Sequence, residues 1–275
     1  MATTYEIPPP AIARSSIEIA RHEIGAATFT VIAGPCSVAA LDPTLRVAQQ
    51  VRQAGAAMLR GGAYKPRTNP DAFQGLEEEG LEILLAVKRE TGLPVVTEVL
   101  DVRDLELALS VADVVQVGAR NMQNTALLKE LGRMDCGVLL KRGLAATIDE
   151  TIGAANYIRH GGNMRVVLCE RGIRTFEPAY RFTLDLMAVP ILQERSGLPV
   201  FVDPSHAPGR RDLVLALSKA AAAIGADGII VEVDESPETA LSDGPQQLRT
   251  RDFGAYMEAV ARVATAEGRR VLHAA

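Results

Sequence analysis

At 275 residues, of which 48% are hydrophobic, the chain can bury a sizeable core as one large α/β domain or two small ones. Its formal net charge of −5 and pI near 5.5 argue against a nucleic-acid partner, so a basic cluster would be a local anion site. The longest apolar runs, roughly six to eight residues, are too short to span a bilayer, and the N-terminus lacks a signal-peptide core. Cys36, Cys136 and Cys169 cannot all pair and lie far apart. We therefore expect a soluble, cytoplasmic protein with reduced thiols and no membrane partner.

Residues 1–28 precede the first long apolar run and are expected to form an N-terminal arm. The proline-rich stretch EIPPPAIARSS is typical of irregular chain, because proline has no amide proton to donate to a helix or sheet. The stretch SIEIARHEIG that follows could form a short hairpin. Such an extension is too small for a regulatory domain.

From residue 29 onward, short runs rich in Val, Ile and Leu recur about every 28 residues, which is the size of one βα unit. The segments between them carry apolar residues at helical spacing, as in LEEEGLEILLAVKRETG, a helix expected to end at Gly92. The runs begin near Phe29, Ala57, Pro94, Asp113, Gly137, Arg165, Pro199 and Asp227.

These runs lack the polar alternation of a half-exposed strand, so they indicate a sheet buried on both faces. Eight strand–helix units fit a (β/α)8 barrel better than a doubly wound open sheet. We therefore predict an α/β chain in which residues 29–275 form a single (β/α)8 TIM barrel after the short N-terminal extension. Active sites of this fold lie at the C-terminal ends of the strands.

Polar side chains follow the end of every predicted strand. Each of them alone could be an ordinary turn residue, but all of them at one barrel mouth favour a functional site. The residues are Cys36, Arg60, Glu98, Gln116, Arg120, Lys141, Arg142, Glu170, Arg171, Asp203, His206, Glu232 and Asp234.

The cations among these residues and in the loops after them predict an anion site. So many positive charges at one mouth would repel one another unless an anion normally lies between them. Guanidinium groups and a lysine ammonium suit phosphate and carboxylate, so two phosphorylated substrates, or a phosphate and a carboxylate, would account for the set. It comprises Arg60, Lys65, Arg67, Arg120, Lys141 and Arg171.

A second group, Cys36, His206, Glu232 and Asp243, could share one metal ion, because strands one, seven and eight are neighbours in a closed barrel. A thiolate, an imidazole and two carboxylates suit Mn²⁺, Fe²⁺, Co²⁺ or Zn²⁺ better than Mg²⁺ or Ca²⁺. From spacing alone the signal is weak. Taken singly, the cysteine is more typical of a small buried hydrophobe, and the others are typical of turns or caps.

Several longer motifs resemble 3-deoxy-D-arabino-heptulosonate 7-phosphate (DAHP) synthase, specifically the short β-type branch of class I, which shares its barrel with 3-deoxy-octulosonate 8-phosphate synthase. The resemblance extends in order from about residue 29 to residue 248. It implies condensation of phosphoenolpyruvate with erythrose 4-phosphate, the first step of the shikimate pathway of aromatic amino acid biosynthesis. The motifs are GPCS, KPRT, FQGLEEEGL, GARNMQN, KRG, CERGIRTFE, DPSHAPGRR and ALSDGPQ.

The resemblance also implies a role for individual residues and for partners. Arg67 and Thr68 would hold erythrose 4-phosphate, and Glu98 and Asp203 would position water or substrate hydroxyls. Lys65 or metal-bound water, together with His206, could shuttle protons. One divalent ion, first of all Mn²⁺, would be bound, and a homo-oligomer, dimer or tetramer, is expected, with any feedback control supplied by a separate partner protein. The implied metal ligands are Cys36, His206, Glu232 and Asp243. The implied phosphoenolpyruvate ligands are Arg60, Lys65, Arg120, Lys141 and Arg171.

Two alternatives stay open. The octulosonate synthase would use arabinose 5-phosphate, but KPRT argues against it because that relative carries a different, Asn-bearing stretch there. A non-catalytic regulatory subunit that binds phosphoenolpyruvate would have a degenerate metal-ligand set, whereas this set is complete. The sequence departs from the family pattern at Asp234–Pro237, where His-Pro-Asn-Pro is usual, and at Phe182, where Asn is frequent. We expect both departures near the rim of the site.

Overall fold

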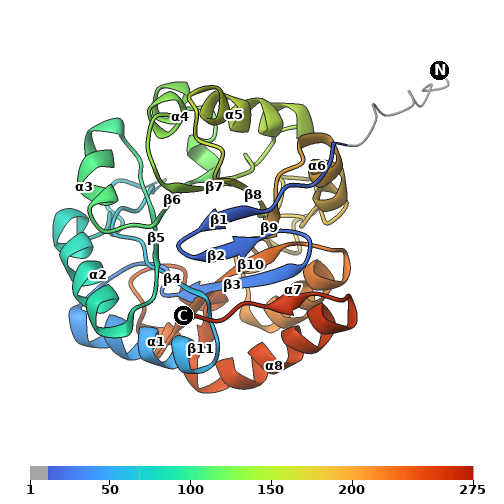
Figure 1. The fold of residues 1–275 in the computed structure, drawn as a ribbon. Coiled ribbons are helices and arrows are strands. Elements are labelled where there is room, and N and C mark those ends of the chain that lie inside the picture. The colour runs from blue at the N-terminus through green and yellow to red at the C-terminus, as the bar shows by residue number, and fades with distance from the viewer. Residues whose placement is uncertain (1–11, 68, 275) are drawn as a thin grey trace.

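The computed structural model describes residues 12–67 and 69–274. Parallel strands close into a barrel, and a helix follows each strand on the outside (Figure 1). Closure is made by β10 and β3, which pair from Gly228↔Thr30 to Glu232↔Gly34. The predicted (β/α)8 fold is confirmed. The barrel strands are β3 (Thr28–Gly34), β4 (Met58–Arg60), β5 (Val95–Glu98), β6 (Val114–Val117), β7 (Gly137–Lys141), β8 (Val166–Glu170), β9 (Val200–Val202) and β10 (Gly228–Asp234).

The outer layer consists of helices α1 (Leu41–Gln53), α2 (Glu77–Thr91), α3 (Leu105–Leu109), α4 (Thr125–Leu131), α5 (Ile148–His160), α6 (Ala188–Ser196), α7 (Val214–Ala223) and α8 (Thr250–Ala266). Helix α2 ends as predicted, because Gly92 adopts the left-handed conformation with φ 69° and donates its amide to Lys88 O. Short 3-10 turns lie in the loops: η1 (Val102–Asp104), η2 (Ala119–Asn121), η3 (Arg211–Leu213), η4 (Pro237–Thr239) and η5 (Gly244–Gln246).

A two-stranded antiparallel hairpin, β1 (Ile17–Ile19) and β2 (His22–Ile24), lies across one end of the barrel (Figure 1). Its Ile17, Ile19 and Ile24 pack into the apolar cluster that fills the barrel lumen. Ile19 lies so close to the start of β7 that a Cβ at Gly137 would be 2.8 Å from Ile19 Cγ2. The hairpin therefore covers the N-terminal end of the barrel, and the opposite end carries the long loops. Two short strands, β11 (Leu248–Arg249) and β12 (Arg270–Val271), extend the sheet beside β10 and β3.

The apolar side chains form two layers, which explains why the strands read as continuous hydrophobic runs. Strand residues such as Val31 and Val115 pack outward against the helices, whereas Ile32 and Phe201 fill the lumen of the barrel. All three cysteines are buried and free. In the described part of the chain, no helix is both long and apolar enough to cross a membrane.

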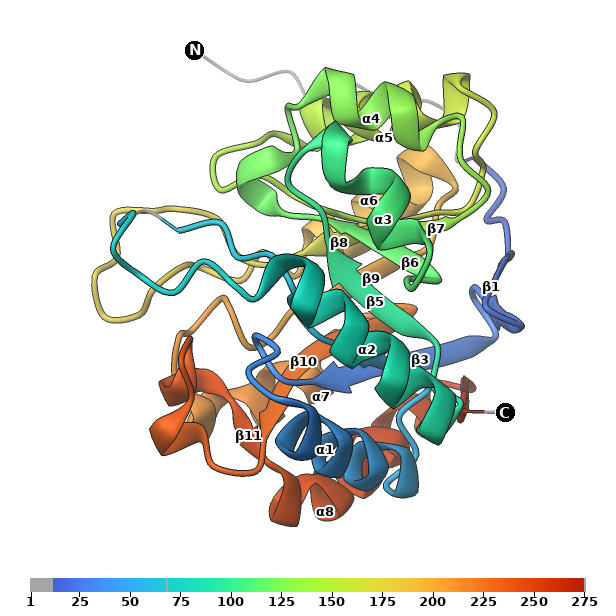
Figure 2. The ribbon, with the colours of Figure 1, turned by 90° about the vertical axis from the view of Figure 1, so that its left-hand side faces the viewer.

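Two long loops extend from the C-terminal end of the barrel. Figure 2 shows them at the left, away from the hairpin: the cyan loop between β4 and α2 and the olive loop between β8 and α6. Residues of both loops line one cavity, so the fold brings residues near 67 and near 181 to the same site.

Candidate active site

The C-terminal ends of the strands surround a cavity of about 280 Å³. Cys36, Asp203 and Glu232 are fully buried behind its lining, with 0% of their surface exposed. Thr68, predicted to hold the sugar phosphate, lies outside the described residues. The predicted residues that line the cavity are Arg60, Lys65, Arg67, Glu98, Gln116, Arg120, Lys141, Arg171, His206 and Asp243.

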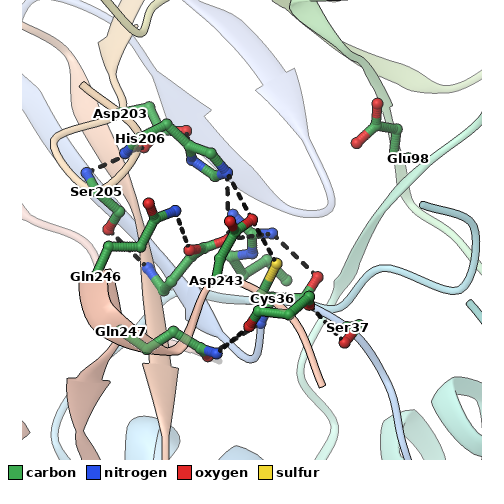
Figure 3. A network of polar contacts seen from close by, with 12 residues as sticks. Cys36, Ser37, Glu98, Asp203, Ser205, His206, Asp243, Gln246 and Gln247 are labelled. Atoms are coloured by element: carbon green, nitrogen blue, oxygen red, sulfur yellow. Dashed lines mark hydrogen bonds and ion pairs between the residues drawn. The ribbon is translucent and has the colours of Figure 1, made fainter. Parts of the chain in front are cut away.

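The four predicted metal ligands come together. Cys36, Glu232 and Asp243 offer ligand atoms that all lie within 4.8 Å of one another. His206 Nε2 lies 3.3 Å from Glu232 Oε1 and 4.0 Å from Asp243 Oδ2. In Figure 3, Cys36, His206 and Asp243 point toward one another although they come from different loops.

The donor set of this cluster fits a divalent ion. Glu232 Oε1 is buried and accepts no hydrogen bond from the described residues, although Arg60 Nη2 lies 3.2 Å away as an ion-pair partner. Burial raises the pKa of the Cys36 thiol to about 12, and the neighbouring carboxylates of Glu232 and Asp243 also raise it. A buried acceptor without a hydrogen bond and a thiol beside two carboxylates are arrangements that a cation would stabilise.

His206 is held so that one ring nitrogen faces this cluster. Asp203 Oδ2 lies 2.6 Å from His206 Nδ1, so the carboxylate favours the tautomer that carries its proton there and leaves a lone pair on Nε2. Burial lowers the pKa of His206, and Asp203 and Glu232 oppose this only in part. For Asp203, burial acts to raise the pKa, but His206 and Lys141 hold it well below its usual value.

Loop residues around the cluster fix its position. Gln246 Nε2 donates to Glu232 Oε2 at 2.6 Å, and Gln247 Oε1 accepts from the backbone N of Cys36 at 3.2 Å (Figure 3). At Gly34 a Cβ would lie 2.1 Å from Arg60 O, so only glycine permits this approach of the strand ends that carry Cys36 and Arg60.

Several cations have hydrogen-bonding capacity to spare. Arg60 Nε and Nη1 and Arg171 Nη1 are buried and have no hydrogen-bond partner among residues 12–67 and 69–274. Lys65 Nζ lies 3.0 Å from both Cys36 O and Cys36 Sγ, and Lys141 Nζ pairs with Asp203. Unpartnered buried guanidinium donors that line a cavity indicate an anionic ligand.

Glu98 lies across the cavity from the metal-ligand cluster (Figure 3). Gln116 Nε2 donates to its Oε2 at 2.9 Å. A Cβ at Gly118 would lie only 2.1 Å from Glu98 Oε1, so the absence of a side chain at Gly118 makes room for the carboxylate. Gln116 and Gly118 both line the cavity and hold Glu98 in place.

Not every polar residue at a strand end faces the cavity. Arg142 Nη1 pairs with Glu170 Oε2 at 2.9 Å and with Asp185 Oδ2 at 2.8 Å, away from the cavity lining. The reason is the alternation of side chains along a strand, which sends Arg142 to the opposite face from Lys141. Asp234 also stays off the lining and accepts a turn hydrogen bond from Ser236 N at 2.7 Å.

Of the two sequence departures expected near the rim, only one lines the cavity. Phe182 lies in the lining together with Arg181, which is not among the residues predicted from the sequence. By contrast, residues 234–237 lie outside the lining, and Glu235 pairs with Arg46 at the surface. The sequence signal for Arg181 was a charged residue in the segment after β8, but nothing local indicated that this segment folds back over the mouth.

A sequence model of the DAHP synthetase I family matches residues 15–266. The chain belongs to this family. A Thermotoga maritima protein named phospho-2-dehydro-3-deoxyheptonate aldolase is 50% identical over 255 residues, which cover 93% of this chain and 75% of that protein. A Syntrophobacter fumaroxidans 2-dehydro-3-deoxyphosphooctonate aldolase is 33% identical over 262 residues, covering 89% of this chain and 90% of that protein.

Solved structures agree with this membership in the DAHP synthetase I family. A crystal structure of the Thermotoga maritima aldolase superposes with a TM-score of 0.90 at 49% identity, covering 94% of this chain and 75% of that one. A truncated form of the 3-deoxy-D-arabino-heptulosonate 7-phosphate synthase from the same organism superposes with a TM-score of 0.87 at 46% identity, covering 94% of this chain and 95% of that one. The family resemblance predicted from the motifs is confirmed.

Proposed function

We propose that this protein condenses phosphoenolpyruvate with D-erythrose 4-phosphate and water to give 3-deoxy-D-arabino-heptulosonate 7-phosphate and phosphate, as a transferase at the first step of the shikimate pathway. The observation that carries the proposal is a single cavity in which Arg and Lys side chains face the Cys36, His206, Glu232 and Asp243 cluster. Membership in the DAHP synthetase I family supports it.

The deep cations are suited to phosphoenolpyruvate, which carries a phosphate and a carboxylate. Arg60 and Arg171 provide the buried donors that lack partners, so a bound anion would complete their hydrogen bonding. Holding two polyanions at bonding distance costs Coulomb energy, which these charges offset while they fix the orientation of the substrate. The proposed phosphoenolpyruvate ligands are the buried Arg60, Lys65, Lys141 and Arg171, together with Arg120, which lines the cavity from an exposed position.

Cys36, His206, Glu232 and Asp243 would hold one divalent ion, Mn²⁺ before Fe²⁺, Co²⁺ or Zn²⁺, which would polarise the sugar aldehyde as a Lewis acid. Asp203 acts through other groups, because it orients the His206 ring and pairs with Lys141. Cys36 must give up its proton when the site is loaded, since burial raises the pKa of the thiol to about 12.

In the proposed reaction, carbon 3 of phosphoenolpyruvate attacks the aldehyde carbon, and positive character develops at carbon 2. Water adds at carbon 2, and phosphate leaves by cleavage of its carbon–oxygen bond. Glu98 faces the cavity from the wall opposite the metal-ligand cluster and would orient that water or a substrate hydroxyl. Lys65 and His206 are the groups positioned to hold or move a proton on the other side.

One assay tests the proposal. Purified protein is stripped of metal, confirmed metal-free by elemental analysis, and given phosphoenolpyruvate with erythrose 4-phosphate or with arabinose 5-phosphate, before and after Mn²⁺ is added. We expect loss of the phosphoenolpyruvate absorbance and release of phosphate with the four-carbon sugar, and only with metal.

The variant Cys36→Ser should abolish the metal response, whereas Cys136→Ser, which changes another buried thiol, should retain it. Preference for arabinose 5-phosphate would identify the octulosonate synthase, in line with the relatives at 33% identity. Binding of phosphoenolpyruvate without turnover of either sugar would identify a regulatory subunit.

We also propose a cytoplasmic location and a homo-oligomeric state, dimer or tetramer. A separate protein would supply any feedback control. Sedimentation equilibrium of the purified full chain measures the oligomeric state directly, and a monomer at micromolar concentration would contradict this part of the proposal.

A further inference from the structure

The loop between β8 and α6, residues 171–187, folds back over the mouth of the barrel. Ile173 N donates to Thr183 O at 2.8 Å, and Thr183 N donates to Ile173 O at 3.0 Å, so the two limbs of the loop pair as antiparallel chains. Phe182 N donates to Ala207 O at 2.8 Å, which ties the returning limb to the loop that carries His206. This backbone pairing fixes residues 181 and 182 at the rim of the cavity.

Arg181 reaches from this rim toward the metal-ligand cluster. Its stem lies against Gly209, where φ is +69° and a Cβ would be 3.1 Å from Arg181 Cβ. Its Nη1 lies 3.3 Å from Gln246 Oε1 and 3.6 Å from Asp243 Oδ1. The side chain keeps 36% of its surface exposed and lines the cavity, so the guanidinium can contact a ligand there.

Phe182 organises two guanidinium groups. The Cζ atom of Arg171 lies 4.5 Å from the centre of the Phe182 ring, and that of Arg181 lies 5.5 Å from it. Each contact is within the range of a cation–π interaction. Arg171 Nη1 has no hydrogen-bond partner within the described ranges, so the aromatic ring orients a buried donor that remains available to a ligand.

The mutual repulsion of Arg171, Arg181 and Arg120 favours a bound anion between them. Burial lowers the pKa of Arg171, and the positive charges of Arg181 and Arg120 lower it further, against the attraction of Asp203. A bound dianion such as a phosphate monoester would relieve this repulsion and would accept hydrogen bonds from more than one guanidinium.

The cations of the cavity differ in depth, which separates two anion positions. Arg60, Lys65 and Arg171 are nearly fully buried, whereas Arg67 is partly buried and Arg181 is exposed, and these two come from the two long loops. The deep position suits phosphoenolpyruvate, whose phosphate and carboxylate would accept hydrogen bonds from the buried donors. The rim position therefore suits the phosphate of the second substrate, whose reacting end would extend inward toward the Asp243 side.

We propose that Arg181 binds the phosphate group of the sugar substrate, and that the Phe182 ring holds its guanidinium at the rim of the cavity. This inference rests on the proposed function, because it takes phosphoenolpyruvate as the ligand of the deep cations. It assigns a substrate-binding role to the loop at 171–187, which brings a second arginine to the sugar phosphate besides Arg67.

The test compares Arg181→Ala with Arg174→Ala, which removes the same charge from an exposed position of the same loop outside the cavity lining. The Michaelis constants for both substrates are measured, together with the Mn²⁺ affinity by calorimetry. Arg181→Ala should raise the constant for erythrose 4-phosphate roughly ten- to a hundredfold, the effect of one charged hydrogen bond. The constant for phosphoenolpyruvate and the Mn²⁺ affinity should stay unchanged, and Arg174→Ala should match the wild type.

Two further variants sharpen the test. Arg181→Lys keeps the charge and should recover part of the affinity, and Phe182→Leu keeps the bulk but removes the ring, so it should raise the sugar constant a few-fold. An unchanged sugar constant in Arg181→Ala would overturn the proposal. A selective loss of Mn²⁺ affinity would also overturn it, because Arg181 would then only brace Asp243.

A binding measurement separates failure of this inference from failure of the proposed function. Inorganic phosphate is titrated calorimetrically into Mn²⁺-loaded wild-type and Arg181→Ala protein with phosphoenolpyruvate already bound. Weaker phosphate binding in the variant supports the rim site even if the wild type turns over neither sugar. Equal phosphate binding in both proteins overturns the rim site even if the wild type is an active synthase.

Discussion

The substitution Gly118→Ala should disable the site through a single methyl group. The backbone at Gly118 has φ −66° and ψ 156°, which alanine adopts without strain. The methyl group would lie 2.1 Å from Glu98 Oε1 and 3.0 Å from Glu98 Cδ, closer than real Cβ contacts, which essentially never fall below 3.0 Å. The carboxylate must therefore move by about 1 Å or swing away, and it then loses its hydrogen bond from Gln116.

The size of the effect follows from that displacement. A hydrogen bond to a charged group contributes about 1.5–3 kcal/mol, and removing glycine's freedom in the unfolded chain returns about 0.4–1 kcal/mol. We expect a net loss of roughly 1–2 kcal/mol in the free energy of unfolding. A misplacement of about 1 Å at a reacting group lowers kcat roughly a hundredfold.

The assay measures kcat with saturating substrates and unfolding in urea for four proteins: wild type, Gly118→Ala, Glu98→Ala and the double variant. In the Glu98→Ala background the methyl group meets no carboxylate, so Gly118→Ala should add no further loss of kcat. Gly153→Ala is the matched control, because a Cβ at this position in α5 would meet no heavy atom within 4 Å apart from its chain neighbours and the adjacent backbone of the helix, and it should retain full activity. A wild-type kcat for Gly118→Ala, or an equal loss in both backgrounds, would refute the reasoning.

Three further outcomes are expected. Burial raises the pKa of Cys36 to about 12, so a bound metal must displace the proton of this thiol. The apparent Mn²⁺ affinity should therefore rise by up to about tenfold per pH unit between about pH 6 and about pH 8. A flat pH profile in calorimetric titrations would count against a thiolate ligand. Arg67→Ala should raise the Michaelis constant for erythrose 4-phosphate roughly ten- to a hundredfold and change that for phosphoenolpyruvate little, and Arg60→Ala should do the reverse. Equal increases for both substrates in each variant would mean that the cations do not form two separate anion sites. Arg142→Met should cost about 3–5 kcal/mol in urea unfolding because it leaves Glu170 buried without its guanidinium, and Arg142→Met with Glu170→Leu should recover much of that loss.

The sequence by itself determined the fold and most of the charged residues that line the cavity. Continuous apolar strands at a regular spacing identify a barrel, because each strand must be buried both in the lumen and under the helices. Strand order then implies that the ends of the first, seventh and eighth strands are neighbours. For that reason Cys36 and Asp243, which lie 207 positions apart, can be grouped from the sequence alone.

Only the tertiary structure decided which polar residues face the cavity and which loop covers it. Arg142 and Lys141 are adjacent in sequence, yet strand alternation sends Arg142 into a buried ion pair and Lys141 to the site. Arg181 and Phe182 reach the rim because residues 173 and 183 pair and because Ala207 accepts a hydrogen bond from the returning limb. These contacts join residues that are ten or more positions apart, across loops whose path a local pattern of residues does not determine.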